Sequence, residues 1–248
     1  EIIEQLLICI FTGNHALLVG VPGLAKTLLV RSLSELLDLK FSRIQFTPDL
    51  MPSDITGTEI LVQDDENSSR QMNFLKGPIF AHIILADEIN RTPPKTQSAL
   101  LEAMEERTVT SIGHRFNLDL PFFVLATQNP IEQEGTYPLP AAQLDRFMVN
   151  LLLDYPEKKE EHDIMRLTVS SEPEELSPVL SKPQIMKIIE TTKKMETPND
   201  VLEYATKLTR ISRPQSSDCP KVTKDFVAWG CSPRAAQSMI MGAKIRSM

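Results

Sequence analysis

The sequence predicts an α/β fold: a parallel five-stranded sheet flanked by helices, followed by a smaller all-α domain. Short apolar runs alternate with segments of helical periodicity as far as about residue 154. After Tyr155 and Pro156 the charge rises, and the remaining segments have helical periodicity. Since this alternation is typical of a parallel sheet with helices on its faces, we expect an α/β domain over residues 1–155 and an incomplete helical domain over residues 156–248.

Each predicted element rests on its own pattern of apolar residues. Short apolar or alternating runs predict strands at residues 15–19, 41–46, 83–86, 122–127 and 149–153. Apolar residues at intervals of three and four predict helices at residues 2–10, 27–39, 95–106 and 139–147. Residues 47–77, rich in Pro, Asp, Gly and Ser, predict a loop or a small inserted hairpin, and residues 108–118 predict a β-hairpin about Gly113.

Composition narrows the classes of protein to which the chain can belong. Its net charge is −7 and its pI about 5.2, which disfavours nucleic acid as a partner, because binding phosphate backbones needs a basic face. No apolar stretch approaches the ~20 residues that span a bilayer, so we expect no membrane insertion. The three cysteines lack metal-ligand spacing and predict free thiols in a reducing, cytoplasmic setting. The chain begins and ends within helix-like runs, so we expect a fragment.

Residues 20–27 lie between a predicted strand and a predicted helix, the context that a phosphate-binding loop requires. A helix N-terminus offers unsatisfied N–H groups to an anion, and Gly23 lets the backbone curl around phosphates. Lys26 can reach the β- and γ-phosphates, and the Thr27 hydroxyl can ligate Mg²⁺. Ala25 stands where such loops usually carry glycine, so an ordinary strand–helix turn is the alternative. The stretch consists of Gly20, Val21, Pro22, Gly23, Leu24, Ala25, Lys26 and Thr27.

Two adjacent carboxylates, Asp87 and Glu88, follow the apolar run of residues 83–86. Such a pair at the end of a buried strand is repulsive unless a cation or a water network uses it. After a phosphate loop, the pair predicts that Asp87 holds Mg²⁺, directly or through water, and that Glu88 polarises the attacking water as a general base. Two solvated acids at an exposed strand end are the alternative.

Asn129 follows another apolar run, residues 122–127. Because the carboxyl ends of parallel strands line the ligand crevice, Asn129 is placed to orient water or to contact the γ-phosphate. An Asn-Pro turn with Pro130 is the alternative, since asparagine favours turns.

Taken in order along the chain, these motifs resemble an AAA+ ATPase, and more narrowly the MoxR family. The resemblance is dense over residues 13–156, and it includes Ala25, which is typical of the MoxR form of the loop. Two arginine-containing stretches complete the series, namely Leu144-Asp145-Arg146-Phe147 and Ser232-Pro233-Arg234. Further stretches that carry the resemblance are residues 86–91, 97–106 and 132–140.

The resemblance implies a role for each motif in ATP binding and hydrolysis. It implies that ATP binds the Walker A motif, residues 20–27, together with Leu28, and that Thr27 and Asp87 hold Mg²⁺. Asp87 and Glu88 correspond to the Walker B motif, and Asn129 corresponds to sensor 1.

The resemblance also implies roles for two arginines. Arg146 corresponds to an arginine finger that acts in trans on the neighbouring subunit's nucleotide, and Arg234 to sensor 2 on a helical lid domain. Arginine suits both roles, because its guanidinium is always charged and forks to phosphate oxygens. Residues 47–77 and 108–118 correspond to inserts that face the pore of a ring or its client.

These expectations lead to one main function and one alternative. We expect Mg-dependent ATP hydrolysis by a ring, expected to be a hexamer of this chain, that acts as a chaperone-like remodeller or maturation factor. The resemblance points to protein clients, including proteins with von Willebrand factor A domains. The alternative is a nucleotide-gated protein-binding module with slow turnover. The Asn-Lys-x-Asp motif of GTPases and the Leu-Ser-Gly-Gly-Gln motif of transporter ATPases do not occur in the sequence.

Overall fold

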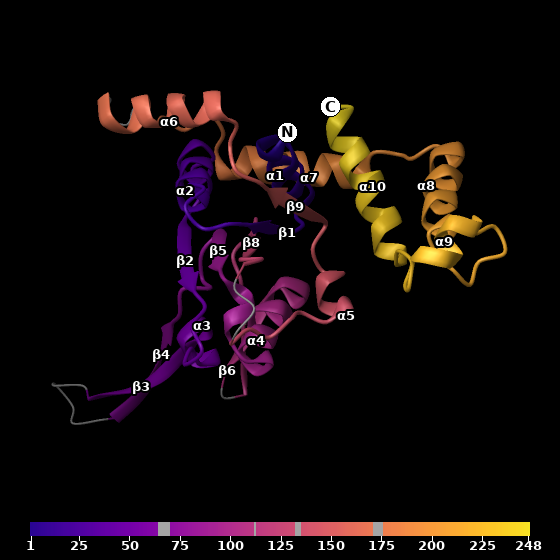
Figure 1. Ribbon diagram of the computed structural model, residues 1–248. Coiled ribbons are helices and arrows are strands. Elements are labelled where there is room, and N and C mark those ends of the chain that lie inside the picture. The colour runs from indigo at the N-terminus through magenta and orange to yellow at the C-terminus, as the bar shows by residue number, and fades with distance from the viewer. Residues whose placement is uncertain (64–69, 112, 132–134, 171–175) are drawn as a thin grey trace.

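The computed structural model describes residues 1–63, 70–111, 113–131, 135–170 and 176–248 (Figure 1). Its centre is a parallel sheet in the order β2-β5-β8-β1-β9. This sheet confirms the predicted fold class, with strand ends within one or two residues of those expected. The strands are β1 Ala16–Gly20, β2 Phe41–Gln45, β5 Ile83–Asp87, β8 Phe123–Gln128 and β9 Val149–Leu153.

Helices cover both faces of the sheet, because its strands are apolar on both sides. Ile83, Ile84 and Leu85 of β5 are each 0% exposed, as expected for a strand that is buried on both faces. One core cluster joins the sheet to α3 and α4, and another joins it to α1 and α2. These elements are α1 Ile2–Thr12, α2 Lys26–Leu36, α3 Pro52–Thr56, the 3₁₀ helix η1 Ile89–Arg91, α4 Pro94–Glu106 and α5 Ala141–Leu144.

Two antiparallel hairpins project from the sheet domain. The inserted hairpin predicted within residues 47–77 consists of β3 (Gly57–Gln63) and β4 (Arg70–Lys76). The second consists of β6 (Thr108–Ser111) and β7 (His114–Asn117). The rings of Phe74 and Phe116 stack with centroids 4.1 Å apart, so the two hairpins lie side by side. Residues 64–69 and 112, which belong to the predicted inserts, lie outside the described part of the chain.

The chain beyond residue 157 is helical where it is described, as predicted. Ile185 and Ile189 of α7 are buried in the cluster that contains α1, whereas α8, α9 and α10 extend to one side of the sheet (Figure 1). A domain boundary near residue 155 stays a prediction. None of the described helices is long and apolar enough to cross a bilayer. The helices are α6 Lys158–Ser170, α7 Lys182–Lys194, α8 Asn199–Ile211, α9 Lys221–Phe226 and α10 Pro233–Arg246.

A buried histidine joins the start of β1 to β8. His15 is 3% exposed, and its Nδ1 accepts the Val124 N–H at 3.0 Å. Burial, and next the charge of Arg107, lower the pKa of His15 well below its ordinary value of 6.5. The imidazole is therefore neutral in the folded protein near neutral pH.

Acidification should destabilise the fold through His15. The unfolded chain takes up a proton below about pH 6.5 while folded His15 stays neutral, so the free energy of unfolding falls as the pH drops through this range. His15→Gln, which offers an acceptor to the Val124 amide, should be less stable at about pH 7.5 but should lose less stability on going to about pH 5. Urea denaturation at both pH values measures this. Burial also lowers the pKa of His82, but this residue is present in both proteins and contributes equally to their losses. Equal losses of stability in the two proteins would therefore contradict the role of His15.

Candidate functional site

Three adjacent strands end at one edge of the sheet and bring the predicted nucleotide-binding residues together. β8 pairs in parallel with β1 on one side and with β5 on the other. The loop that follows Gly20, the pair Asp87 and Glu88, and Asn129 therefore lie at the same edge. This is the crevice in which parallel α/β sheets bind ligands.

The loop after β1 has left-handed backbone at Gly23 and Ala25 and a close contact at Gly20. A Cβ on Gly20 would lie 2.8 Å from the Leu153 carbonyl oxygen, so only glycine fits here. Gly23 has a φ of 86°, and no atom of the described residues lies within 4 Å of a Cβ added to it, so these residues leave space around it. Ala25 has a φ of 50° and a ψ of 26°, a left-handed conformation that costs an L-residue ~1–2 kcal/mol. Of the remaining loop residues, Val21 is buried, Leu24 and Thr27 are half-buried, and Pro22 is exposed.

Lys26 begins α2 and faces the acidic pair. Its Nζ donates to the Gly20 carbonyl oxygen at 2.8 Å, so the side chain folds back over the loop. Burial lowers the pKa of Lys26, while the charges of Asp87 and Glu88 act in the opposite direction. The ammonium thus lies between the loop and the carboxylates, where an anion between them would contact it.

Asp87 is fixed by two donors from neighbouring strands. The Thr127 hydroxyl donates to Oδ1 at 2.6 Å, and the Arg43 guanidinium donates to Oδ2 at 2.7 Å. The same Thr127 oxygen accepts the Glu88 N–H at 2.9 Å. Thr127 is 0% exposed, so water does not compete for these hydrogen bonds, which hold the carboxyl end of β5 beside β8.

Among the residues that the structure describes, the hydrogen bonds to the Glu88 carboxylate reach one of its two oxygens. Its Oε2 accepts from Gln45 Nε2 at 3.0 Å and from Arg91 Nη1 at 2.9 Å. Its φ of 56° is left-handed, a conformation that clusters at functional sites. Since an ionised carboxylate offers about four lone-pair positions, Oε1 keeps acceptor capacity for water. Gln45, Arg91, Arg43 and Thr127 are site residues that the sequence motifs did not identify.

The oxygen donors at this edge fit a magnesium ion bound mainly through phosphates. Thr27 lies in the first turn of α2, next to Lys26, on which the charge of Asp87 at the end of β5 acts. Within the described ranges, no group of three or more His, Cys, Asp or Glu side chains could hold a metal. Mg²⁺ usually keeps several waters and uses one or two carboxylates with substrate phosphates, so Thr27 and Asp87 fit that mode. Leu28, also predicted to contact the nucleotide, is 62% exposed.

Asn129 forms the turn that the sequence left open as the alternative, and its role toward water or the γ-phosphate stays a prediction. It is 6% exposed at the end of β8, and its Oδ1 accepts the Ile131 N–H at 3.1 Å. The side chain therefore caps a turn while lying at the edge of the sheet that carries the loop. Glu132, Gln133 and Glu134, which open the family-like stretch 132–140, lie outside the described residues.

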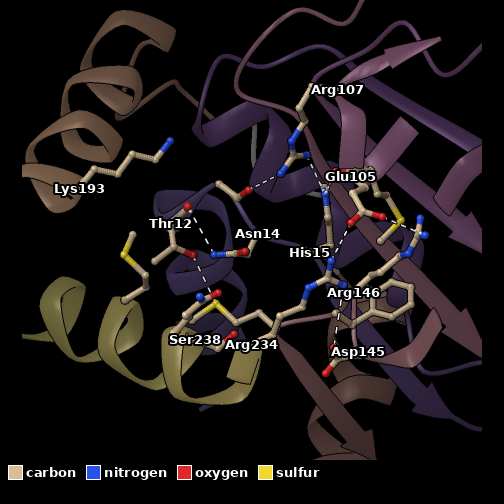
Figure 2. A pocket seen from close by; sticks show the side chains of 16 residues that line it. Thr12, Asn14, His15, Glu105, Arg107, Asp145, Arg146, Lys193, Arg234 and Ser238 are labelled. Atoms are coloured by element: carbon tan, nitrogen blue, oxygen red, sulfur yellow. Dashed lines mark hydrogen bonds and ion pairs between the residues drawn. The ribbon is translucent and has the colours of Figure 1, made fainter. Parts of the chain in front are cut away.

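The two predicted arginines lie together but apart from Lys26. Arg146 Nη2 and Arg234 Nη2 bind the two oxygens of Glu105, at 2.9 and 2.7 Å (Figure 2). Both arginines line a cavity of about 400 Å³ that also contains His15. His15 precedes β1, whereas the phosphate loop follows it, so the two sites are separated by the length of the strand, ~16 Å. In Figure 1, α2 and α10 correspondingly lie toward opposite ends of the sheet.

Comparison with known proteins gives consistent matches. A model of the ATPase family associated with various cellular activities (AAA) matches residues 15–149. Uncharacterized protein YeaC of Bacillus subtilis is 44% identical over 239 residues, 96% of this chain and 71% of that protein. Chaperone MoxR1 of Mycobacterium tuberculosis is 41% identical over 245 residues, 98% of this chain and 63% of that protein, so the chain spans less than two thirds of it. A candidate ATPase from Cytophaga hutchinsonii has a crystal structure with a TM-score of 0.87 at 44% identity, covering 98% of this chain and 73% of that chain.

Thr127→Val should weaken the site at nearly constant side-chain volume. Valine lacks the hydroxyl that binds Asp87 and the Glu88 amide, and an unpaired buried N–H costs ~1–3 kcal/mol. We expect the free energy of unfolding to fall by about this amount and Mg²⁺-dependent binding of a fluorescent ATP analogue to weaken. The control Thr127→Ser keeps the hydroxyl and should behave like the parent. Equal binding and stability in the valine and serine variants would refute the bridging role of Thr127.

Proposed function

Because the chain belongs to the ATPase family associated with various cellular activities and is of MoxR type, we propose that it binds Mg·ATP on residues 20–28 and hydrolyses it as part of a ring. The ring, a hexamer in this proposal, acts as a chaperone-like remodeller or maturation factor for protein clients. The observation that carries the proposal is the meeting of the loop, Lys26, Asp87 and Glu88 at one edge of the sheet.

Nucleotide binding rests on donors at the start of α2. The N–H groups of the loop and of the first helical turn are unsatisfied within the helix and face an anion favourably. Lys26 Nζ exchanges the Gly20 carbonyl oxygen for the β- and γ-phosphate oxygens. Thr27 and Asp87 would hold a magnesium ion, which would supply charge neutralisation for the phosphates.

Hydrolysis rests on Glu88 as general base. Its Oε1, to which no described residue donates a hydrogen bond, accepts a proton from water placed in line with the γ-phosphate, while Gln45 and Arg91 hold Oε2. Asn129, at the end of the adjacent β8, orients this water or the γ-phosphate.

Arg146 and Arg234 serve the nucleotide of a neighbouring subunit. They lie at the opposite end of β1 from Lys26, so neither reaches the phosphate loop of its own subunit in this arrangement. Arg234, expected as sensor 2 on a helical lid domain, thus has the same role in trans as Arg146 in this proposal. An arginine supplied in trans makes hydrolysis depend on assembly, which supports the ring.

Client binding and cellular location complete the proposal. A relative of the chain is named a chaperone, which supports protein clients, and clients with von Willebrand factor A domains belong to the same proposal. The β3–β4 and β6–β7 hairpins, which pack on each other, are the surfaces offered to the client. The free thiols of Cys9, Cys219 and Cys231 support a cytoplasmic setting. The net charge of −7 supports proteins rather than nucleic acids as clients.

A nucleotide-gated binding module with slow turnover is the second candidate. It is favoured by the left-handed Ala25 and by the two donors that already occupy Glu88 Oε2. Steady-state phosphate release with and without an added protein client separates the two functions. Hydrolysis that proceeds at a steady rate without a client favours the ATPase over the module.

Glu88→Gln should abolish hydrolysis while keeping ATP bound. The amide is isosteric but cannot accept the proton, so kcat should fall by ~10²–10⁴-fold. Phosphate-release assays measure kcat, and equilibrium titration with a fluorescent ATP analogue measures binding. Parent-like turnover in this variant would show that another group acts as the base.

Arg146→Ala should be rescued by subunits that cannot hydrolyse ATP themselves. Alone, the variant should lose ~10³-fold or more in kcat with ATP binding unchanged, because only the transition state loses its cation. Mixed with Glu88→Gln subunits, which keep their arginines, it should regain turnover. Mixed assemblies as inactive as the separate variants would contradict action in trans.

A further inference from the structure

One carboxylate connects the two arginines. Glu105 lies in the last turn of α4, and each of its oxygens binds a different guanidinium, Oε2 that of Arg146 and Oε1 that of Arg234. Arg146 Nη1 also donates to the Leu101 carbonyl oxygen of the same helix. Residues from α4, from the segment after α5 and from α10 thus converge on Glu105 (Figure 2).

The arrangement needs a negative charge between the arginines. Two guanidiniums side by side repel each other, and Arg234 also lies in the first turn of α10, where the helix dipole disfavours a cation. Glu105 offsets both effects and restricts two long side chains that would otherwise sample many rotamers. With 39% of its side chain exposed, Glu105 lies at the surface, where the partially exposed arginines remain accessible.

A second contact fixes the segments that carry the arginines. The Ser232 hydroxyl donates to Asp145 Oδ1 at 2.5 Å and accepts the Arg234 N–H at 3.1 Å, so it caps α10 and ties it to the residue before Arg146. Asp145 Oδ2 lies 3.9 Å from Arg234 Nη1. The start of α10 therefore keeps a defined position beside Arg146 in a single subunit.

The cavity beside the cluster suits an anion. Arg107 and Lys193 line it together with Arg146 and Arg234, whereas Glu105 and Asp145 are its two carboxylates, so cations exceed anions (Figure 2). Each guanidinium has five N–H donors, and the contacts named above use only some of them. Donors thus remain for the oxygens of a phosphate group.

We propose that Glu105 is a positioning residue that holds Arg146 and Arg234 together as one anion-binding pair for the γ-phosphate of the neighbouring subunit's ATP. The inference rests on the proposed function and adds that the two arginines act as a unit through Glu105. Glu105 itself stays on the far side of the guanidiniums and does not contact the phosphate.

Glu105→Gln is the informative variant. The amide keeps the shape but replaces one acceptor by a donor, so it can bind one guanidinium and repels the other. We expect kcat to fall by ~10–100-fold, less than for loss of an arginine, while KM and ATP binding stay unchanged because the phosphate loop lies at the other end of β1. Glu102→Gln makes the same charge change on the exposed side of α4 and should behave like the parent.

Two measurements separate positioning from a merely structural effect. In the double variant Arg146→Ala/Arg234→Ala, adding Glu105→Gln should cause no further loss of kcat, because Glu105 acts only through the arginines. Mixed with Glu88→Gln subunits, Glu105→Gln subunits should regain turnover. The Glu88→Gln subunits then supply correctly held arginines to the ATP that is bound by the Glu105→Gln subunits.

The outcomes distinguish this inference from the proposed function. Three outcomes would overturn the role of Glu105 alone. They are a parent-like kcat in Glu105→Gln, a further loss of kcat when Glu105→Gln is added to the double variant, and failed rescue of Glu105→Gln while Arg146→Ala is rescued. Failed rescue of both variants would overturn the action in trans and the inference with it.

Discussion

The parallel pairing of β8 with both β1 and β5 is the constraint on which the rest of the structure depends. This pairing places the carboxyl ends of β1, which leads into the phosphate loop, and of β5, which carries the acidic pair, on either side of β8. The Thr127 hydroxyl of β8 binds both Asp87 and the Glu88 amide. The carboxylates are thereby oriented before any ligand arrives, and the energetic cost of placing them side by side is met by Thr127, Arg43 and Lys26.

The length of β1 separates the two groups of predicted site residues within one subunit. The loop and acidic pair follow the sheet's strands, whereas Arg146 and Arg234 lie by His15, where β1 begins. A strand of five residues keeps these groups ~16 Å apart, further than an arginine side chain reaches. In the proposed function a neighbouring subunit therefore completes each site, and the Glu105 cluster holds the two arginines that this neighbour contributes.

The sequence alone predicts features that are contiguous in the chain. The five strands, the loop at residues 20–27 and the pair Asp87 and Glu88 are each encoded by a local run, and the structure places them as expected. Contacts across strands or helices are not encoded in this way: Gln45 reaches Glu88 only because β2 pairs with β5. Likewise, Glu102, Glu105 and Glu106 are alike in sequence, and the packing of Arg146 and of α10 beside α4 distinguishes Glu105. The position of Arg234 also depends on where the helical part docks, which a short motif does not specify.

The most direct test is a crystal structure of the chain with Mg²⁺ and a non-hydrolysable ATP analogue. The account predicts that Lys26 Nζ leaves the Gly20 carbonyl oxygen for the β- and γ-phosphates, and that magnesium lies between Thr27 and Asp87. A nucleotide bound elsewhere, or Lys26 still on Gly20 with the phosphates out of its reach, would contradict the account.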